Sequence, residues 1–134
     1  MPAHAIPSRR EACVAVLAGC CMPRLGRATS VSSTPIFVLN SLDATVSVID
    51  PVSFAETKRI PTGKEPHHLY LTPDEKSLLV ANALGNSLTF IDPVTAEVQR
   101  VLNDIVDPYH LRFSPDMKWF VTAANRLDHV DLYH

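Results

Sequence analysis

Three histidines and one arginine are the side chains in this sequence best suited to bind a ligand or a metal. His68 and His110 lie 42 residues apart, His67 directly precedes the first, and Arg112 follows the second by two residues. Imidazoles bind metal ions and can face a haem, and a guanidinium binds carboxylates through paired hydrogen bonds. The four residues therefore predict a cofactor site, a metal site at His68 and His110, or a polar surface that holds water.

Motifs of other enzyme classes are missing from the chain. No serine stands in a Gly-x-Ser-x-Gly elbow, and the 4 glycines form no cluster that could cradle a phosphate. No Cys-x-x-Cys-His run is present for covalent haem attachment. We therefore predict no catalytic residue, and no cofactor unless the histidines hold a haem or a metal.

The charge distribution argues against a nucleic-acid partner. The formal net charge is −2, and the chain after residue 30 carries 8 basic and 13 acidic side chains. An acidic surface repels phosphate backbones. No run of 18 apolar residues is present, so contact with a membrane is expected only through a lipid anchor.

The first thirty residues have the features of an export signal. Arg9 and Arg10 precede an apolar stretch at 12–22, as in a secretory signal. The run Leu-Ala-Gly-Cys that ends at Cys20 resembles a bacterial lipobox, which would make Cys20 the lipidated residue. Two alternatives stay open: cleavage after Ala28 without a lipid, and a disordered or wrongly assigned start. Export predicts a periplasmic or outer-surface protein, lipid-anchored if Cys20 is acylated.

The elements that position the histidines follow a repeat of 42 residues. The Asp-Pro pair at 50–51 recurs at 92–93, and His68 recurs as His110. A unit of this length, built of short apolar runs and turn residues, is typical of stacked β-blades. Equivalent residues of successive units then point the same way, which predicts a common orientation for the two imidazoles.

Short runs rich in β-branched and aromatic residues predict an all-β fold. No segment keeps the spacing of apolar residues that an amphipathic helix needs. The predicted strands are 36–40, 45–50, 55–60, 67–72, 77–82, 87–92, 97–102, 109–113, 119–123 and 129–133.

The units resemble the YVTN-type bacterial β-propeller repeat. The aromatic-Val-Thr-Asn motif of that family corresponds to residues 37–40 and 79–82, and each is followed by an apolar strand that ends in Ile-Asp. A Pro-His pair at Pro66 and the Pro-Asp-x-Lys turns complete the unit. Glu75 and Met117 depart from the family pattern, because they stand where it has a turn glycine.

The resemblance implies where the candidate residues lie. In the family's topology, the strands that begin near His68 and His110 are the innermost ones around a central channel, and Tyr70 and Arg112 share their direction. The d1-haem domain of cytochrome nitrite reductases is a related propeller, so a haem-linked role is also implied. The family repeat normally carries a histidine here whatever the activity, which favours a rim of solvated side chains.

The resemblance also predicts the domain organisation. After a non-globular segment at 1–30, residues 35–134 would form about two and a half four-stranded antiparallel blades, fewer than the about four needed for a closed ring. We expect a partial blade at 35–60, a full blade at 67–102 and a partial blade at 109–134. The chain is then a truncated propeller, and its open blade edges could self-associate.

Three functions are compatible with this sequence. The first is an exported, non-enzymatic propeller that serves as a binding or scaffold module for a protein or small molecule. The second is a haem- or metal-linked redox propeller that uses His67, His68 and His110. The third, a lactonase-like hydrolase, would need acidic metal ligands at the channel, whereas the acidic residues here are predicted to lie in turns.

Overall fold

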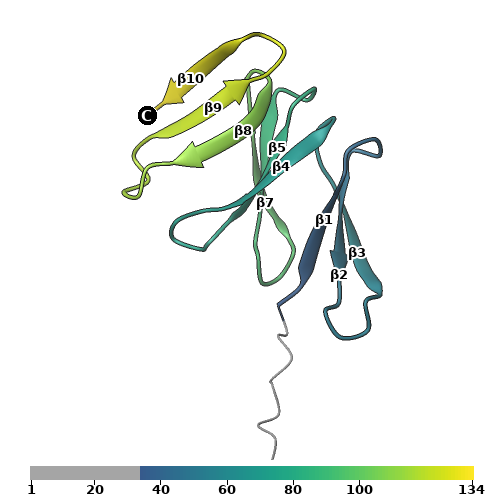
Figure 1. Cartoon of the computed structure of the whole chain (residues 1–134). Helices are drawn as coiled ribbons and strands as arrows, with labels where there is room; N and C mark the ends of the chain where they lie inside the picture. The colour runs from purple at the N-terminus through teal and green to yellow at the C-terminus, as the bar shows by residue number, and fades with distance from the viewer. Residues whose placement is uncertain (1–33) are drawn as a thin grey trace, which may run out of the picture. The chain divides into compact units, whose positions relative to one another are not determined.

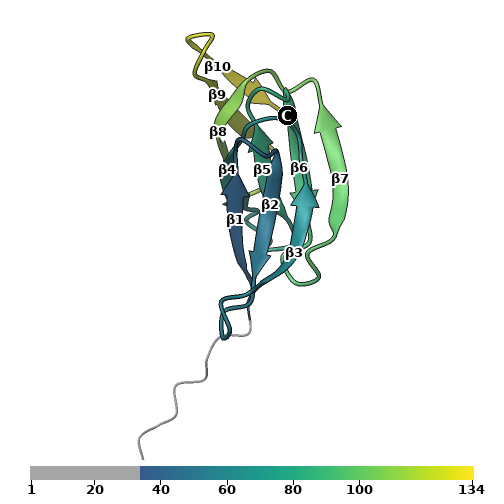
Figure 2. The ribbon, with the colours of Figure 1, turned by 90° about the vertical axis from the view of Figure 1, so that its right-hand side faces the viewer.

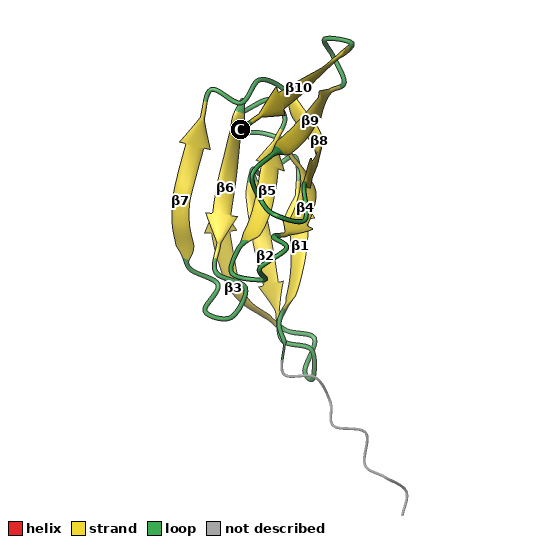
Figure 3. Ribbon diagram, turned by 90° about the vertical axis from the view of Figure 1, so that its left-hand side faces the viewer, coloured by secondary structure: helices red, strands yellow, loops and turns green. Residues whose placement is uncertain are grey.

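The computed structural model describes residues 34–134, and these contain ten β-strands and no helix (Figure 3). The expected signal and the lipidation at Cys20 lie outside the described residues. The strands are β1 (Ile36–Asn40), β2 (Thr45–Ile49), β3 (Glu56–Pro61), β4 (Pro66–Leu71), β5 (Leu78–Asn82), β6 (Ser87–Ile91), β7 (Val98–Asn103), β8 (Pro108–Phe113), β9 (Phe120–Ala124) and β10 (His129–Tyr133). All ten predicted strands are therefore present, with ends shifted by one residue at most.

The strands form three antiparallel sheets with the orders β1-β2-β3, β4-β5-β6-β7 and β10-β9-β8. In Figure 1 the four-stranded sheet lies between the two three-stranded sheets. A shift of 42 residues maps β1–β3 onto β5–β7 and β4–β6 onto β8–β10 with identical strand bounds. The predicted all-β, propeller-type arrangement of antiparallel blades is thus confirmed.

Irregularities of the sheets repeat together with the strands. The pairing of β4 with β5 shifts between Pro66 and His68, and the pairing of β8 with β9 shifts between Pro108 and His110. Each shift is a β-bulge, in which one strand has an extra residue without a partner on the neighbouring strand. The bulge changes the direction in which the side chain of that residue points. The bulged residues are His67 and Tyr109, so the sheet irregularity falls within the candidate site.

Short polar contacts fix the hairpins and turns. The Asn82 amide donates to the hydroxyls of Ser87 and Thr89 at 3.2 and 3.0 Å, and Asn40 makes the equivalent pair of bonds in the first sheet. After β6, the Asp92 carboxylate accepts the backbone N–H groups of Val94 and Thr95. These bonds satisfy turn amides and lower the pKa of Asp92. This aspartate is therefore a turn residue, as predicted from its Pro-linked position.

Two hydrophobic clusters hold the sheets together. The first interface lies between β1–β3 and β4–β7, and the second lies between β4–β7 and β8–β10 (Figures 1 and 2). All fully buried residues of the first cluster are aliphatic, whereas the second cluster also buries an aromatic ring. The first buries Val46, Val48, Ile60, Val80, Ile91 and Ala96. The second buries Leu79, Ala81, Leu88, Phe90, Ile105 and Leu111. The four-stranded sheet contributes to both clusters, so both of its faces are covered.

Among the described residues, no helix has the length and apolar character that a membrane crossing requires.

Candidate functional site

The two bulges bring rings from neighbouring sheets into contact. The ring of His67 in β4 stacks on the ring of Tyr109 in β8, with centroids 3.7 Å apart. The Nδ1 atom of His67 is buried and has no hydrogen-bond partner among the described residues. Sequence reasoning did not assign Tyr109 to the site, although the 42-residue shift identifies it as the counterpart of His67.

The next residues of the same two strands form the polar centre of the site. The rings of His68 and His110 meet edge to face, with centroids 4.3 Å apart. Arg112 Nη1 lies 3.1 Å from His68 Nε2 and donates a second hydrogen bond to the Leu111 carbonyl at 2.9 Å. We call His68, His110 and Arg112 the inner cluster. The predicted site residues are therefore brought together, and the two imidazoles lie side by side.

The Tyr70 ring packs against the guanidinium of Arg112. The Arg112 Cζ atom lies 5.2 Å from the centroid of the Tyr70 ring, within the range of a cation–π contact. Tyr70 in turn stacks against Phe113, with centroids 5.9 Å apart. The sequence predicted that Tyr70 shares a direction with Arg112, and the contact explains how the guanidinium is held beside His68.

Burial and neighbouring positive charge lower the pKa of His68 in the inner cluster. Partial burial, followed by the proximity of His110, Arg112 and His67, lowers the pKa of His68 below its ordinary value of 6.5. His68 is then neutral at pH 7, and its Nε2 lone pair can accept the Arg112 hydrogen bond. His110 and Arg112 are exposed, which leaves them accessible to a dissolved ligand.

A shallow apolar pocket lies beside the inner cluster. Its volume is about 290 Å³, and His110 and Arg112 lie at one side of it. Its remaining walls are Leu111, Val121, Ala123 and Val130. The combination can accept a molecule with a polar end and an apolar body. These apolar wall residues carry no sequence motif, so only the folded arrangement of β8–β10 reveals them.

The inner cluster supplies fewer metal ligands than most metal sites need. No group of three or more His, Cys, Asp or Glu residues within 34–134 is arranged to hold a metal ion. His68 and His110 provide two imidazoles, but Arg112 occupies the Nε2 lone pair of His68. A metal or a haem iron at this nitrogen would have to displace the guanidinium, so this geometry suits an anion better than a cation.

A second polar network joins loops of the β4–β7 sheet to loops of the β8–β10 sheet, away from the inner cluster. The Arg126 backbone N–H donates to Asp107 Oδ2 at 2.7 Å, and its guanidinium Nη2 lies 2.8 Å from Asp107 Oδ1. The same Nη2 donates to the Ala83 carbonyl at 2.7 Å, and Nη1 lies 3.6 Å from a Glu65 oxygen. Asp107 is buried, and Arg126 supplies the positive charge beside its carboxylate, although Oδ1 accepts no hydrogen bond from the described residues. Nothing in the sequence pattern indicated it.

A family model matches nearly the whole chain. The model, described as a YNCE-like β-propeller, covers residues 5–134. No curated protein sequence matches the chain.

Several solved structures share the fold at low sequence identity. Hydrazine synthase of Kuenenia stuttgartiensis is 22% identical, with a TM-score of 0.61 over 74% of this chain and 29% of that chain. Dihydro-haem d1 dehydrogenase NirN, in complex with DHE, is 21% identical, with a TM-score of 0.57 over 67% and 19%. A candidate 6-phosphogluconolactonase from Bacteroides uniformis is 16% identical, with a TM-score of 0.55 over 72% and 32%. The chain therefore spans about a third or less of the length of these proteins.

Proposed function

The chain belongs to the YNCE-like β-propeller family, and from that premise we propose that it is a non-enzymatic binding module for an anionic small molecule. The ligand would bind at the inner cluster, where His68, His110 and Arg112 meet between β4 and β8. Fold alone does not identify a ligand, because propellers carry many unrelated functions. The proposal therefore rests on the chemistry of this cluster.

The observation that carries the proposal is a cation without an acidic partner. Within residues 34–134, two arginines, Arg59 and Arg126, have carboxylates within 4 Å, whereas Arg112 has none. Arg112 instead points its Nη1 at a neutral imidazole. An incoming carboxylate could accept from the guanidinium and from the imidazoles, and charge-assisted bonds of this kind are stronger than neutral ones.

The neighbouring apolar pocket narrows the ligand class. Val121 and Val130 line the same pocket as Arg112, so the carboxylate should be attached to an apolar group. The Val130 side is exposed, which leaves room for a ring or a short alkyl chain. A simple aromatic carboxylate such as benzoate is therefore a suitable probe.

Haem- or metal-linked redox chemistry is the second candidate, favoured by the two imidazoles with centroids 4.3 Å apart. A haem would bring carboxylate groups that Arg112 could bind, and it would supply the electron-transfer chemistry. The geometry supports this role less well because His68 Nε2 is already hydrogen-bonded to Arg112. A lactonase-like hydrolase has less support still, since no carboxylate pairs with any residue of the inner cluster within the described range.

Calorimetric titration with benzoate tests the anion proposal on the full 134-residue chain. Binding should strengthen as the pH falls below 6.5 through the lowered pKa of His68, because the protonated imidazole attracts the carboxylate more strongly. Arg112→Gln should weaken binding about tenfold, which corresponds to the loss of one charged hydrogen bond. Lys118→Gln is the matched control, because it removes an exposed cation on the turn after β8 without touching the cluster.

Each outcome separates the candidates. Binding that depends on Arg112 but not on Lys118 supports the anion site. If Arg112→Gln and Lys118→Gln weakened benzoate binding equally, the binding would reflect general charge attraction, and the proposal would be overturned. A parallel titration with haem favours the redox candidate if a defined Soret shift appears and is lost in His110→Asn.

We also propose that the module is exported, on the basis of the basic-apolar pattern of the first thirty residues. Labelling of expressing bacteria with a fatty-acid analogue should mark the protein, and the label should be lost in Cys20→Ser. An exported but unlabelled protein would favour cleavage after Ala28. Retention of Met1 in the cytoplasm would contradict export altogether.

A further inference from the structure

A polar pocket of about 550 Å³ lies at the first interface and shares no residue with the inner cluster. Its walls come from the loop between β3 and β4, the β5–β6 hairpin, and strands β6 and β7. The polar side chains among them include Lys64, Ser87, Thr89 and Asn103. Every residue that lines it within 34–134 is neutral or basic. We call it the hydroxyl pocket, because two buried hydroxyls form part of its wall.

The hydroxyls of Ser87 and Thr89 both have a proton to donate. The two residues are 4% and 1% exposed. The side-chain amide of Asn82 donates to Ser87 Oγ at 3.2 Å and to Thr89 Oγ1 at 3.0 Å, so both hydroxyls accept from one nitrogen. A hydroxyl that accepts keeps its own proton for another partner, and no described atom accepts either of these protons. The pocket wall therefore offers two neighbouring donors.

The first sheet shows which partner these donors lack. Its equivalent hydroxyl, on Ser47, accepts from the Asn40 amide at 2.8 Å and donates to a Glu56 oxygen at 3.2 Å. The 42-residue shift places Val98 where the first sheet has Glu56, so Thr89 has no carboxylate in that position. A buried donor without an acceptor is costly. The acceptor for Thr89 must then come from solvent or from a ligand.

Lys64 adds a positive charge at the rim of the pocket. It is exposed, and within residues 34–134 it has no ion-pair partner. Two carboxylates share the adjoining surface with it, but both are engaged by arginines. An Asp43 oxygen lies 3.7 Å from Arg59 Nη1. A Glu65 oxygen lies 3.6 Å from Arg126 Nη1. The Lys64 ammonium is therefore available to an anion.

A glycine brings the Lys64 loop against the hydroxyls. A methyl group added at Gly63 would lie 2.8 Å from Ser87 Oγ, which leaves no room for a side chain there. The Gly85 N–H donates to the Lys64 carbonyl at 3.0 Å and joins the same loop to the β5–β6 hairpin. At the second interface the counterpart of Gly63 is Ile105, which is buried in the second hydrophobic cluster. Only the first of these two positions places bare backbone beside the hydroxyls.

We propose that the hydroxyl pocket binds a small phosphate monoester. Its three terminal oxygens would accept from the hydroxyls of Ser87 and Thr89 and from the Lys64 ammonium, which is one donor for each oxygen. The volume of about 550 Å³ exceeds what a phosphate fills, so the organic part of the ester would lie against the remaining walls. There the Asn103 amide can bond a hydroxyl of the ester. This site does not depend on the inner cluster.

Titration of the isotope-labelled full chain with glycerol 3-phosphate at pH 8 tests the proposal. Gly63 and Gly85 are two of the 4 glycines in the chain, so their amide signals are easily assigned reporters of the pocket. Lys64→Gln should weaken binding about tenfold, because one charge-assisted hydrogen bond is lost. Thr89→Val removes a donor with little change of shape and should weaken binding about fivefold.

Two matched variants serve as controls. Lys76→Gln removes an exposed cation from the turn between β4 and β5, outside the pocket, and Ser47→Ala removes the equivalent hydroxyl of the first sheet. Both should keep the affinity of the natural chain. Circular dichroism of each variant checks that the sheets persist. Because Lys64 is exposed, Lys64→Gln keeps the proposal testable even if Thr89→Val fails to fold.

The pH dependence distinguishes this pocket from the inner cluster. A phosphate monoester loses its second proton near a pH of about 6 and then carries a larger negative charge. Binding of glycerol 3-phosphate should therefore be several times stronger at pH 8 than at pH 5. Anion binding at the inner cluster should instead strengthen as the pH falls. Arg112→Gln should leave the titration of the hydroxyl pocket unchanged.

Each outcome supports or overturns the proposal. Shifts at Gly63 and Gly85 that weaken in Lys64→Gln and persist in Lys76→Gln support it. No saturable shift at millimolar ester, or equal weakening by the two lysine variants, overturns it. Binding that Arg112→Gln abolishes also overturns it, because the ester would then occupy the inner cluster. Equal affinity for glycerol would contradict the role of the phosphate, and equal affinity for inorganic phosphate would contradict the assignment to an ester.

Discussion

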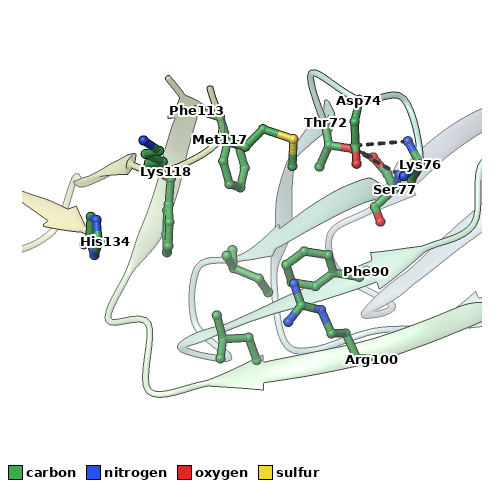
Figure 4. A pocket seen from close by; sticks show the side chains of 13 residues that line it. Thr72, Asp74, Lys76, Ser77, Phe90, Arg100, Phe113, Met117, Lys118 and His134 are labelled. Carbon is green, nitrogen blue, oxygen red and sulfur yellow. Dashed lines mark hydrogen bonds between the residues drawn. The ribbon is translucent and has the colours of Figure 1, made fainter. Parts of the chain in front are cut away.

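The first and second interfaces occupy equivalent places in the repeat and yet differ in chemistry. Val48 and Ile91 of the first correspond to Phe90 and Tyr133 of the second under the 42-residue shift. A ladder of stacked rings runs through the second, where Phe120 and Tyr133 have centroids 4.5 Å apart. At the first, Lys58 Nζ donates to the Ala96 carbonyl at 2.7 Å and pairs with Glu97. The second instead contains a pocket of about 470 Å³ lined by Phe90, Arg100 and Met117 (Figure 4).

The comparison shows which features recur with the repeat, namely the backbone pairing, and which vary, namely the side chains between the sheets. Strand bounds, bulges and registers recur without change, so they follow from backbone pairing and turn chemistry. The residues that fill the space between sheets vary, because many apolar combinations can reach a similar packing density. The inner cluster lies at the second interface, where Arg100 and Arg112 have no carboxylate partner within residues 34–134.

The largest expected difference between the interfaces concerns two equivalent leucines. Leu111 is 1% exposed in the second cluster, while its counterpart Leu69 packs at the margin of the first. Leu111→Ala should reduce the free energy of unfolding by about 3 kcal/mol, and Leu69→Ala by about half as much. Urea denaturation of both variants measures this difference. Equal losses would mean that the two interfaces are energetically alike despite their different packing.

The polar network at the second interface should give the next largest effect. Arg126→Ala removes the cation from the buried Asp107 carboxylate, and we expect a loss of about 2 kcal/mol, moderated because Arg126 is partly exposed. Leu84 is its counterpart and is 56% exposed, so Leu84→Ala should change the stability by less than about 0.5 kcal/mol. Thermal unfolding can compare the pair. A neutral Arg126→Ala would show that water satisfies Asp107.

A smaller contrast is expected between two equivalent cations, Lys58 and Arg100. Lys58→Met removes a hydrogen bond to a buried turn and an exposed ion pair, so a loss of about 1 kcal/mol is expected. Arg100→Met removes only the contact with Phe90, which should cost about 0.5 kcal/mol in the isolated chain. The loss at Lys58 should shrink in high salt, because exposed ion pairs are screened. A larger loss at Arg100 than at Lys58 would indicate that Arg100 already has an internal partner.

The pH dependence of stability should also belong to the second interface. The pKa of His68 is lowered in the folded state, so the folded protein resists protonation at this position. Neutral His68 contributes fully to the free energy of unfolding above its pKa in the unfolded state, near 6.5. This contribution is lost as the pH falls from there through the lower pKa of the folded state. Denaturation midpoints between pH 8 and pH 5 should therefore decline less in His68→Asn than in the natural chain.

The smallest effects are expected at two equivalent turns of the repeat, one between β4 and β5 and the other between β8 and β9. Glu75 and Met117 have φ values of 58° and 57°, in the left-handed region where a side chain is strained. Substitution of either by Gly should stabilise the chain by about 0.5 kcal/mol, because relief of strain exceeds the added entropy of the unfolded state. Equal gains at the two positions would show that the turns are interchangeable. A destabilising Met117→Gly would instead assign its side chain a packing role at the pocket of Arg100.

Most of the fold could be predicted because its signals are local. Alternating apolar residues define the strands, and the Asp-Pro and Pro-Asp pairs define the turns, as at Asp92 and Asp74. The repeat then requires equivalent strands to pair in equivalent ways. The two bulges could not be predicted, since Pro66 and Pro108 mark a strand start equally well with or without an extra residue.

The candidate site was predictable only in part. The repeat placed His68 beside His110, and the structure shows this contact. The hydrogen bond from Arg112 to His68 was not predictable, because it depends on the separation of two sheets and on a rotamer supported by Tyr70. Arg126 and Asp107 were missed for the same reason: their pairing joins loops whose approach is determined only by sheet packing.

Each sheet is a simple meander in which every strand pairs with the next one along the chain. Contacts between distant parts of the sequence arise only when one sheet packs against the next. The sheets can therefore form one after another along the chain. The four-stranded sheet gains neighbours on both faces and should be the nucleus from which this ordering spreads. The backbone amides of β5 and β6 should then be the last to exchange hydrogen with solvent. The two three-stranded sheets should unfold locally and independently, with a lower free energy of opening.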